Sequence, residues 1–167
     1  MRKASIWAMA FGLVLATGAR TAAESIPYDA SKLKSVCVRV ENTPFPAEVF
    51  GLTKDALGNY AYVWIKGKLP KLAADYGTGR ACETGTPSLW ITVNIDSLDQ
   101  VRGYYGVVDV HLVRRTLWET GERGLGIAYS ASTIFKGGSR NAELQVKLIL
   151  DELLTEFAAE YYKAGNP

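Results

Sequence analysis

The stretch GVVDVHLVRR, residues 106–115, carries the only histidine of the chain, two residues after an aspartate. Asp109 and His111 are residue types that act as an orienting acid and a base, or as metal ligands. On a strand, positions i and i+2 project from the same face, so the two side chains would lie side by side. Alternating apolar residues indicate that this is a strand: Val108, Val110 and Leu112. The pair is then predicted to lie on the polar, solvated face.

Chemistry by this pair would need further groups. The chain has no GxSxG string, in which common serine hydrolases place their nucleophile, and its glycine-bearing loops match neither Walker A nor GxGxxG. A zinc site needs three or four converging ligands, whereas Asp96, Asp109 and His111 would form a weak set. The sequence predicts no catalytic residue, no metal and no cofactor. The alternative is a small-molecule binder or minor hydrolase that uses Asp109 and His111.

The N-terminus has the pattern of a secretory signal peptide. Arg2 and Lys3 precede an apolar run over residues 6–16, which is shorter than the roughly 20 residues needed to span a bilayer. Small residues favour cleavage after Ala23, with Ala19 as the alternative. We expect a signal peptide over 1–23, a single domain over 24–167, a periplasmic or secreted location, and no membrane span after cleavage.

Charge and cysteine content fit an exported domain. Signal removal takes away three of the 19 basic side chains and none of the 17 acidic ones, so the mature chain lacks the basic excess of nucleic-acid-binding domains. Two cysteines in an oxidising compartment predict a disulfide between Cys37 and Cys82. A redox dithiol is the alternative, but its usual CxxC spacing is absent.

Four segments have the apolar patterns of strands. In residues 33–42 three valines oppose Cys37, Arg39 and Glu41, and in residues 89–96 four aliphatic residues oppose Trp90, Thr92, Asn94 and Asp96. Residues 103–115 carry Tyr105, Asp109 and His111 on the polar side. The faces of the strand over residues 124–135 stay unassigned, because Leu125, Ile127 and Tyr129 alternate with small residues that could equally lie beneath a tightly packed helix. Gly121 predicts a hairpin between the last two segments. A short strand over 80–83 would bring Cys82 beside the first strand.

Two helices complete the expected fold. The first begins after Thr53 as N-cap, with Leu52 stapled to Leu57, although Gly58 within it costs about 1 kcal/mol relative to alanine. The second runs over about 139–163, capped by Ser139 and ended by Gly165, and is strongly amphipathic. Three strands with one apolar face each predict an α/β (α+β) two-layer sandwich, with a mixed sheet of four to five strands and both helices on one face.

The motifs VCVRV, GLT and EFAAEYYKAGNP stand in an order that resembles small exported bacterial domains, similar to the N-terminal domain of the periplasmic translocation protein TolB. The resemblance implies a non-enzymatic α/β interaction module. It provides no family catalytic residues to carry over to this chain.

The uncovered sheet face is the predicted binding surface, because Trp, Tyr and Arg are the residue types that anchor interfaces. We expect an interaction module that binds another envelope protein or itself. Histidine changes charge between about pH 5 and 8, so binding through His111 would depend on pH in that range. The candidate residues are Arg39, Trp90, Thr92, Asn94, Tyr105, Asp109 and His111. The alternative is an ordinary solvated face with a stray tryptophan.

Overall fold

A computed structural model describes residues 33–41, 50–77, 79, 82–98, 103–117, 123–138 and 141–165. The predicted signal peptide and both cleavage positions lie outside these residues.

Five strands form one mixed sheet in the order β2-β1-β3-β4-β5. The strands are β1 (Ser35–Val40), β2 (Ala73–Tyr76), β3 (Ser88–Leu98), β4 (Gly103–Leu117) and β5 (Arg123–Gly138). Strand β1 pairs in parallel with β2 and β3, whereas β3, β4 and β5 pair antiparallel in sequence order. The predicted antiparallel pairing of the last two segments is confirmed, and its connection falls outside the described residues.

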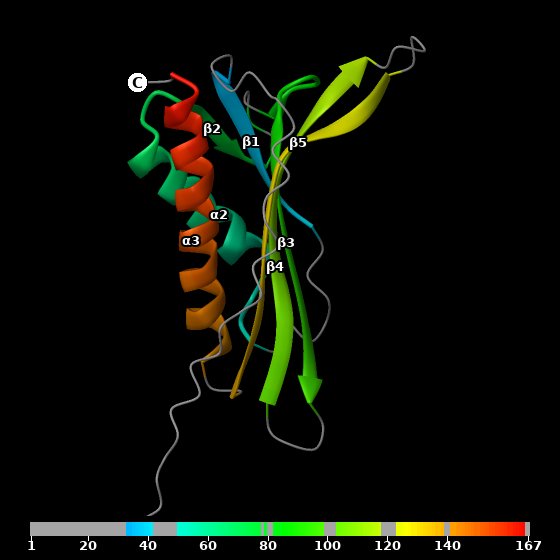
Figure 1. The fold of residues 1–167 in the computed structure, drawn as a ribbon, viewed down its shortest axis with the longest axis vertical. Coiled ribbons are helices and arrows are strands. Elements are labelled where there is room, and N and C mark those ends of the chain that lie inside the picture. The colour runs from blue at the N-terminus through cyan, green and yellow to red at the C-terminus, as the bar shows by residue number, and fades with distance from the viewer. Residues whose placement is uncertain are drawn as a thin grey trace, which may run out of the picture.

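Helices α2 (Lys54–Lys68) and α3 (Ala142–Lys163) cover the same face of the sheet (Figure 1), which confirms the two-layer architecture. Their apolar sides join the inward side chains of the strands in one core, and every inward valine of β1 is at most 3% exposed. Helix α2 begins as predicted: the Thr53 hydroxyl accepts a hydrogen bond from the Ala56 N–H at 3.2 Å. Leu52 and Leu57 are both buried.

Two predicted positions are wrong. The extra strand beside β1 is residues 73–76, where the Ala73 N–H donates to the Lys34 carbonyl (3.0 Å). Of the predicted strand over 80–83, residues 80 and 81 lie outside the described part of the chain, and Cys82 and Glu83 are not in a strand. Cys82 instead lies in a turn, where it forms the predicted disulfide with Cys37. The long helix also starts later than Ser139. Since β5 stays paired as far as Gly138, the N-cap position falls to Asn141, whose side chain makes no capping hydrogen bond.

The structure settles the faces of β5. Tyr129, Ala131 and Phe135 point into the core, whereas Ile127 and Ile134 point outward and are 46% and 57% exposed. A register shift between Leu112 and Val113 accompanies the change in alternation. Beyond it, the end of the β4–β5 hairpin leans away from the helices (Figure 1).

Candidate binding surface

The face of the sheet opposite the helices is called the open face below. The strand register places its side chains in cross-strand rows. Arg39, Trp90, His111 and Ser130 form one row, and Thr92, Asp109 and Ser132 form the next. Two further rows are Asn94, Val107 and Ile134, then Asp96, Tyr105 and Lys136. All seven residues expected from the sequence to line a binding surface therefore lie on this one face, across β1, β3 and β4.

Asp109 and His111 lie side by side, half-buried, in adjacent rows. The register brings two serines beside them that the sequence did not single out: Ser132 opposite Asp109 and Ser130 opposite His111. No hydrogen bond joins any of these four side chains within the described part of the chain. The contacts of a base with its orienting acid, or with a nucleophile, are therefore not formed in this structure.

Asp96 lies away from that pair. It is paired with Tyr105, four residues from Asp109 along β4, which corresponds to about 13 Å of strand. The Tyr105 hydroxyl donates a hydrogen bond to Asp96 (3.1 Å), and this bond raises the pKa of the phenol. No group of three or more His, Cys, Asp or Glu side chains that could hold a metal occurs among the residues that the structure describes.

Two polar atoms on the open face lack partners. The Trp90 indole N–H and the His111 Nδ1 atom are both buried, and neither has a hydrogen-bond partner within the described residues. They belong to directly opposite residues of β3 and β4. An unmade hydrogen bond at a buried polar atom costs about 1–3 kcal/mol. This pair therefore marks a place where an incoming polar group would be favoured.

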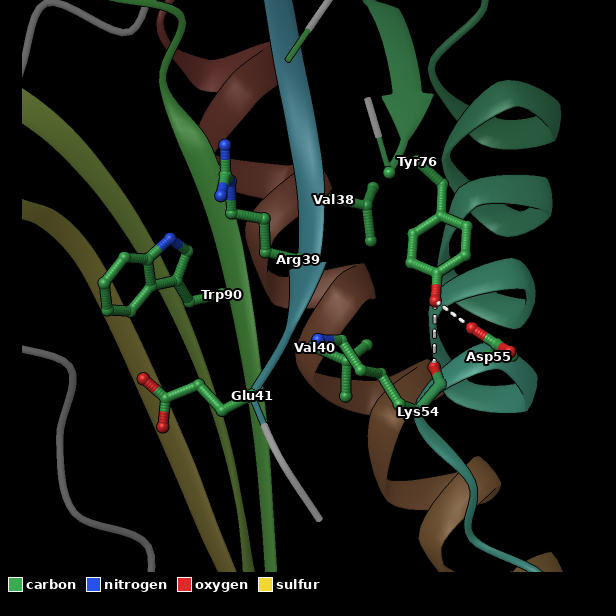
Figure 2. Close-up of a pocket in the computed structure, with 9 residues that line it drawn as sticks. Val38, Arg39, Val40, Glu41, Lys54, Asp55, Tyr76 and Trp90 are labelled. Carbon is green, nitrogen blue, oxygen red and sulfur yellow. Dashed lines mark hydrogen bonds between the residues drawn. The ribbon is translucent and has the colours of Figure 1, made fainter. Parts of the chain in front are cut away.

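A groove of about 480 Å³ opens between β1 and the start of α2 (Figure 2). We call it the edge groove. Strand β2 ends at Tyr76, opposite Val38, so β1 continues past its neighbour. The N–H groups of Cys37 and Glu41 donate hydrogen bonds toward β3. Because backbone N–H groups point alternately to the two sides of a strand, the N–H of Val40 points toward the groove. The edge groove therefore presents a stretch of strand edge that no described residue pairs.

Tyr76 forms the far wall of the edge groove. Its hydroxyl donates to Asp55 (2.9 Å) and lies 3.3 Å from the Lys54 carbonyl, so the ring bridges from β2 to the first turn of α2 (Figure 2). Burial, followed by the bond to Asp55, raises the pKa of Tyr76. The ring packs where a side chain at Gly58 would stand. This contact explains the glycine that sequence reasoning treated only as a cost to the helix.

A second, shallower depression of about 610 Å³ lies at the other end of the open face. Tyr105, Val107 and Ile134 line it with Asn94 and Asp96. Tyr105 and Ile134 are 47% and 57% exposed, so this end of the face carries large apolar surface in contact with solvent. Trp90, in contrast, stands where the open face meets the edge groove (Figure 2).

The end of the open face at which β1 and β3 begin, called its upper end, is buried, although the sequence predicted a solvated face there. Cys37 and Val113 point outward with Ser88 in one row, yet they are 0% and 6% exposed. The disulfide attaches residue 82, and with it the segment that leads to β3, directly to Cys37 on this face. The sequence signal for this cover was the cysteine pair itself.

No protein-family model matches the chain, and no curated protein matches it. Within the described residues, no helix is long and apolar enough to cross a membrane.

Proposed function

We propose that this protein is an exported, non-catalytic interaction module that binds another protein of the cell envelope through its open face. The observation that carries the proposal is the gathering of Trp90, Tyr105 and Ile134 on the one sheet face that neither helix covers. Large aromatic side chains on an accessible surface are the usual anchors of protein interfaces. They bury much apolar area at small conformational cost.

The arrangement of polar groups supports a protein ligand. The apolar depression around Tyr105 is bordered by Asn94 and Asp96, while the row of Trp90 and His111 holds two unpartnered polar atoms. A hydrophobic centre with polar groups at its rim is the usual anatomy of an interface. The part of the β1 edge that no described residue pairs adds backbone groups that an extended segment of a partner would pair.

Export is supported by two independent features. The first residues have the pattern of a signal peptide, and Cys37 is joined to Cys82 by a disulfide of the kind that persists in oxidising compartments. The resemblance of the motif order to exported domains such as the TolB N-terminal domain favours the same setting and a role without catalysis. We therefore place the partner in the periplasm or outside the cell.

Site-specific photo-crosslinking in the producing cell tests the proposal. A photoreactive amino acid replaces Ile134 on the open face or, as a control, Leu148 on α3, because the two side chains are 57% and 56% exposed. We expect one adduct with an envelope protein from position 134 and none from position 148. A parallel Trp90→Ala chain that still folds should lose that adduct.

Equal adducts from both positions, or none from position 134, would refute the open face as a docking surface. An adduct of twice the mass of the chain would overturn the choice of partner, because it identifies a second copy as the occupant. Sedimentation of the purified chain shows independently whether it forms dimers.

A further inference from the structure

A third pocket, of about 240 Å³, lies at the upper end of the open face, and we call it the arginine pocket. One wall is the segment from Cys82 to Ser88, which contributes the hydroxyl-bearing residues Thr84, Thr86 and Ser88. The other walls come from four strands: Arg39 of β1, Trp90 of β3, Arg114 and Arg115 of β4, and Leu125 of β5. The pocket thus crosses the sheet above Trp90, apart from the depression around Tyr105.

Positive charge gathers in this pocket. Three arginines and one acid, Glu83, line it, in a chain whose basic and acidic side chains nearly balance after signal removal. Arg114 already takes part in another interaction. Arg39 and Arg115 have no ion-pair partner within the described residues. Figure 2 shows the Arg39 guanidinium directed along β1 away from Glu41, which instead accepts a hydrogen bond from Thr92.

Four other lining side chains carry hydrogen-bond donors: Thr84, Thr86, Ser88 and Trp90. The hydroxyls of Thr84, Thr86 and Ser88 make no hydrogen bond within the described residues. The indole nitrogen of Trp90 lies on the edge of the ring nearest Arg39 and has no acceptor there (Figure 2). Guanidinium groups, hydroxyls and an indole N–H all donate to oxygen, and arginine in particular matches the geometry of oxyanions. The pocket therefore favours a ligand that carries several acceptor oxygens.

The hydroxyl-bearing wall is held in place before any ligand arrives. The disulfide ties residue 82 to β1, and the Cys37 N–H donates to the Pro87 carbonyl at 2.9 Å. Between these two attachments the Thr86 N–H donates to the Glu83 carbonyl (3.1 Å), and Gly85 takes the positive φ, +100°, that the turn requires. A wall fixed at both ends reduces the ordering cost of binding.

We propose that the arginine pocket binds a phosphate-type oxyanion through Arg39 and Arg115. Its volume lies below the roughly 300–1,000 Å³ of pockets for drug-sized ligands, so it accepts a single phosphate group rather than a whole cofactor. The group is either a soluble phosphate or the phosphate of a lipid head. This site goes beyond the proposed protein-binding role, since neither Arg115 nor the Cys82–Ser88 segment belongs to the apolar depression.

Calorimetric titration of the purified, disulfide-intact chain with sodium phosphate, against sodium chloride at matched ionic strength, tests the proposal. We expect Arg39→Ala and Arg115→Ala each to weaken phosphate binding about tenfold or more, as loss of a hydrogen bond to a charged group implies. Lys71→Ala removes the same charge from an exposed site outside the pocket and should leave binding unchanged. Glu83→Gln should strengthen binding.

Sedimentation with phosphatidylcholine vesicles, with or without phosphatidic acid, separates the two sources of phosphate. Co-sedimentation that requires phosphatidic acid and is lost in Arg115→Ala assigns the group to a lipid head. Phosphate binding without co-sedimentation assigns it to a soluble phosphate. Two results would overturn the proposal: no phosphate binding by the unmodified chain, or equal loss of binding in Lys71→Ala and Arg115→Ala. A crosslink from position 134 would stand in either case.

Discussion

The contact between Tyr76 and Gly58 reverses the usual effect of a helix substitution. Gly58→Ala in a helix interior normally stabilises by about 1 kcal/mol. Here an ideal Cβ at residue 58 would overlap the Tyr76 ring, since even the third-closest ring atom, Cδ2, is 2.8 Å away. The ring would have to swing out and lose the bond from its hydroxyl to Asp55. Overpacking of this kind costs about 1–3 kcal/mol.

Gly67→Ala in the same helix is the matched control, because nothing lies within 4 Å of a Cβ at that position. We expect Gly67→Ala to stabilise the protein by up to about 1 kcal/mol and Gly58→Ala to destabilise it by about 1 kcal/mol, a difference of about 2 kcal/mol. Urea unfolding of the two variants measures it, and for a chain of this size 1 kcal/mol shifts Tm by about 4 °C.

A double variant identifies the cause. In the background of Tyr76→Ala, the space beside residue 58 is free, so Gly58→Ala should regain its stabilising effect through a coupling of about 2 kcal/mol. Should Gly58→Ala stabilise the unmodified protein as much as Gly67→Ala does, the placement of the Tyr76 ring against α2 would be refuted. The shape of the edge groove, whose far wall is that ring, would then need revision as well.

Two further predictions concern stability. Cys82→Ser should lower the free energy of unfolding by about 4 kcal/mol, because the disulfide closes a loop with a sequence separation of 45, and an unchanged urea midpoint would contradict this. Burial, followed by the hydrogen bond to Asp151, raises the pKa of Tyr60 from 10.0 to about 12. The folded state therefore keeps this proton longer than the unfolded state does, so stability that is intact below pH 10 falls as the pH rises toward 12. Tyr60→Phe should reduce that fall without abolishing it, since burial also raises the pKa of Tyr129. Circular dichroism at rising pH measures the fall. Identical alkaline profiles of the variant and the unmodified protein would count against the bond to Asp151.

Much of the fold was predictable because the long strands and the amphipathic helix repeat their spacing of apolar residues over many positions. The inward and outward positions follow the alternation in β1 and in β3 as far as Asp96. Strand β2 escaped prediction because its four residues, AADY, are too few to show a period and contain no β-branched residue. The register shift at Leu112/Val113 was equally hidden, because it depends on how two strands pair rather than on either alone.

The candidate surface was likewise predictable from the sequence only in part. Alternation was enough to assign Trp90, Tyr105 and His111 to one face, because each belongs to a strand with a clear apolar side. The arginine pocket was not predictable, since Arg39 and Arg115 are far apart in sequence and line one pocket only because three strands pair. The two unpartnered polar atoms likewise depend on neighbours that only the folded chain supplies.

The disulfide has a consequence for the connectivity of the chain. By joining Cys37 to Cys82 it closes a covalent ring that contains all of α2 and β2. A protease that cuts the backbone once within that ring opens it but releases neither fragment, because the cystine still holds the two pieces together. The nicked protein would run as one species on a non-reducing gel and as two after reduction. The part of the chain that walls the edge groove is thus retained after a cleavage that would release an unlinked segment.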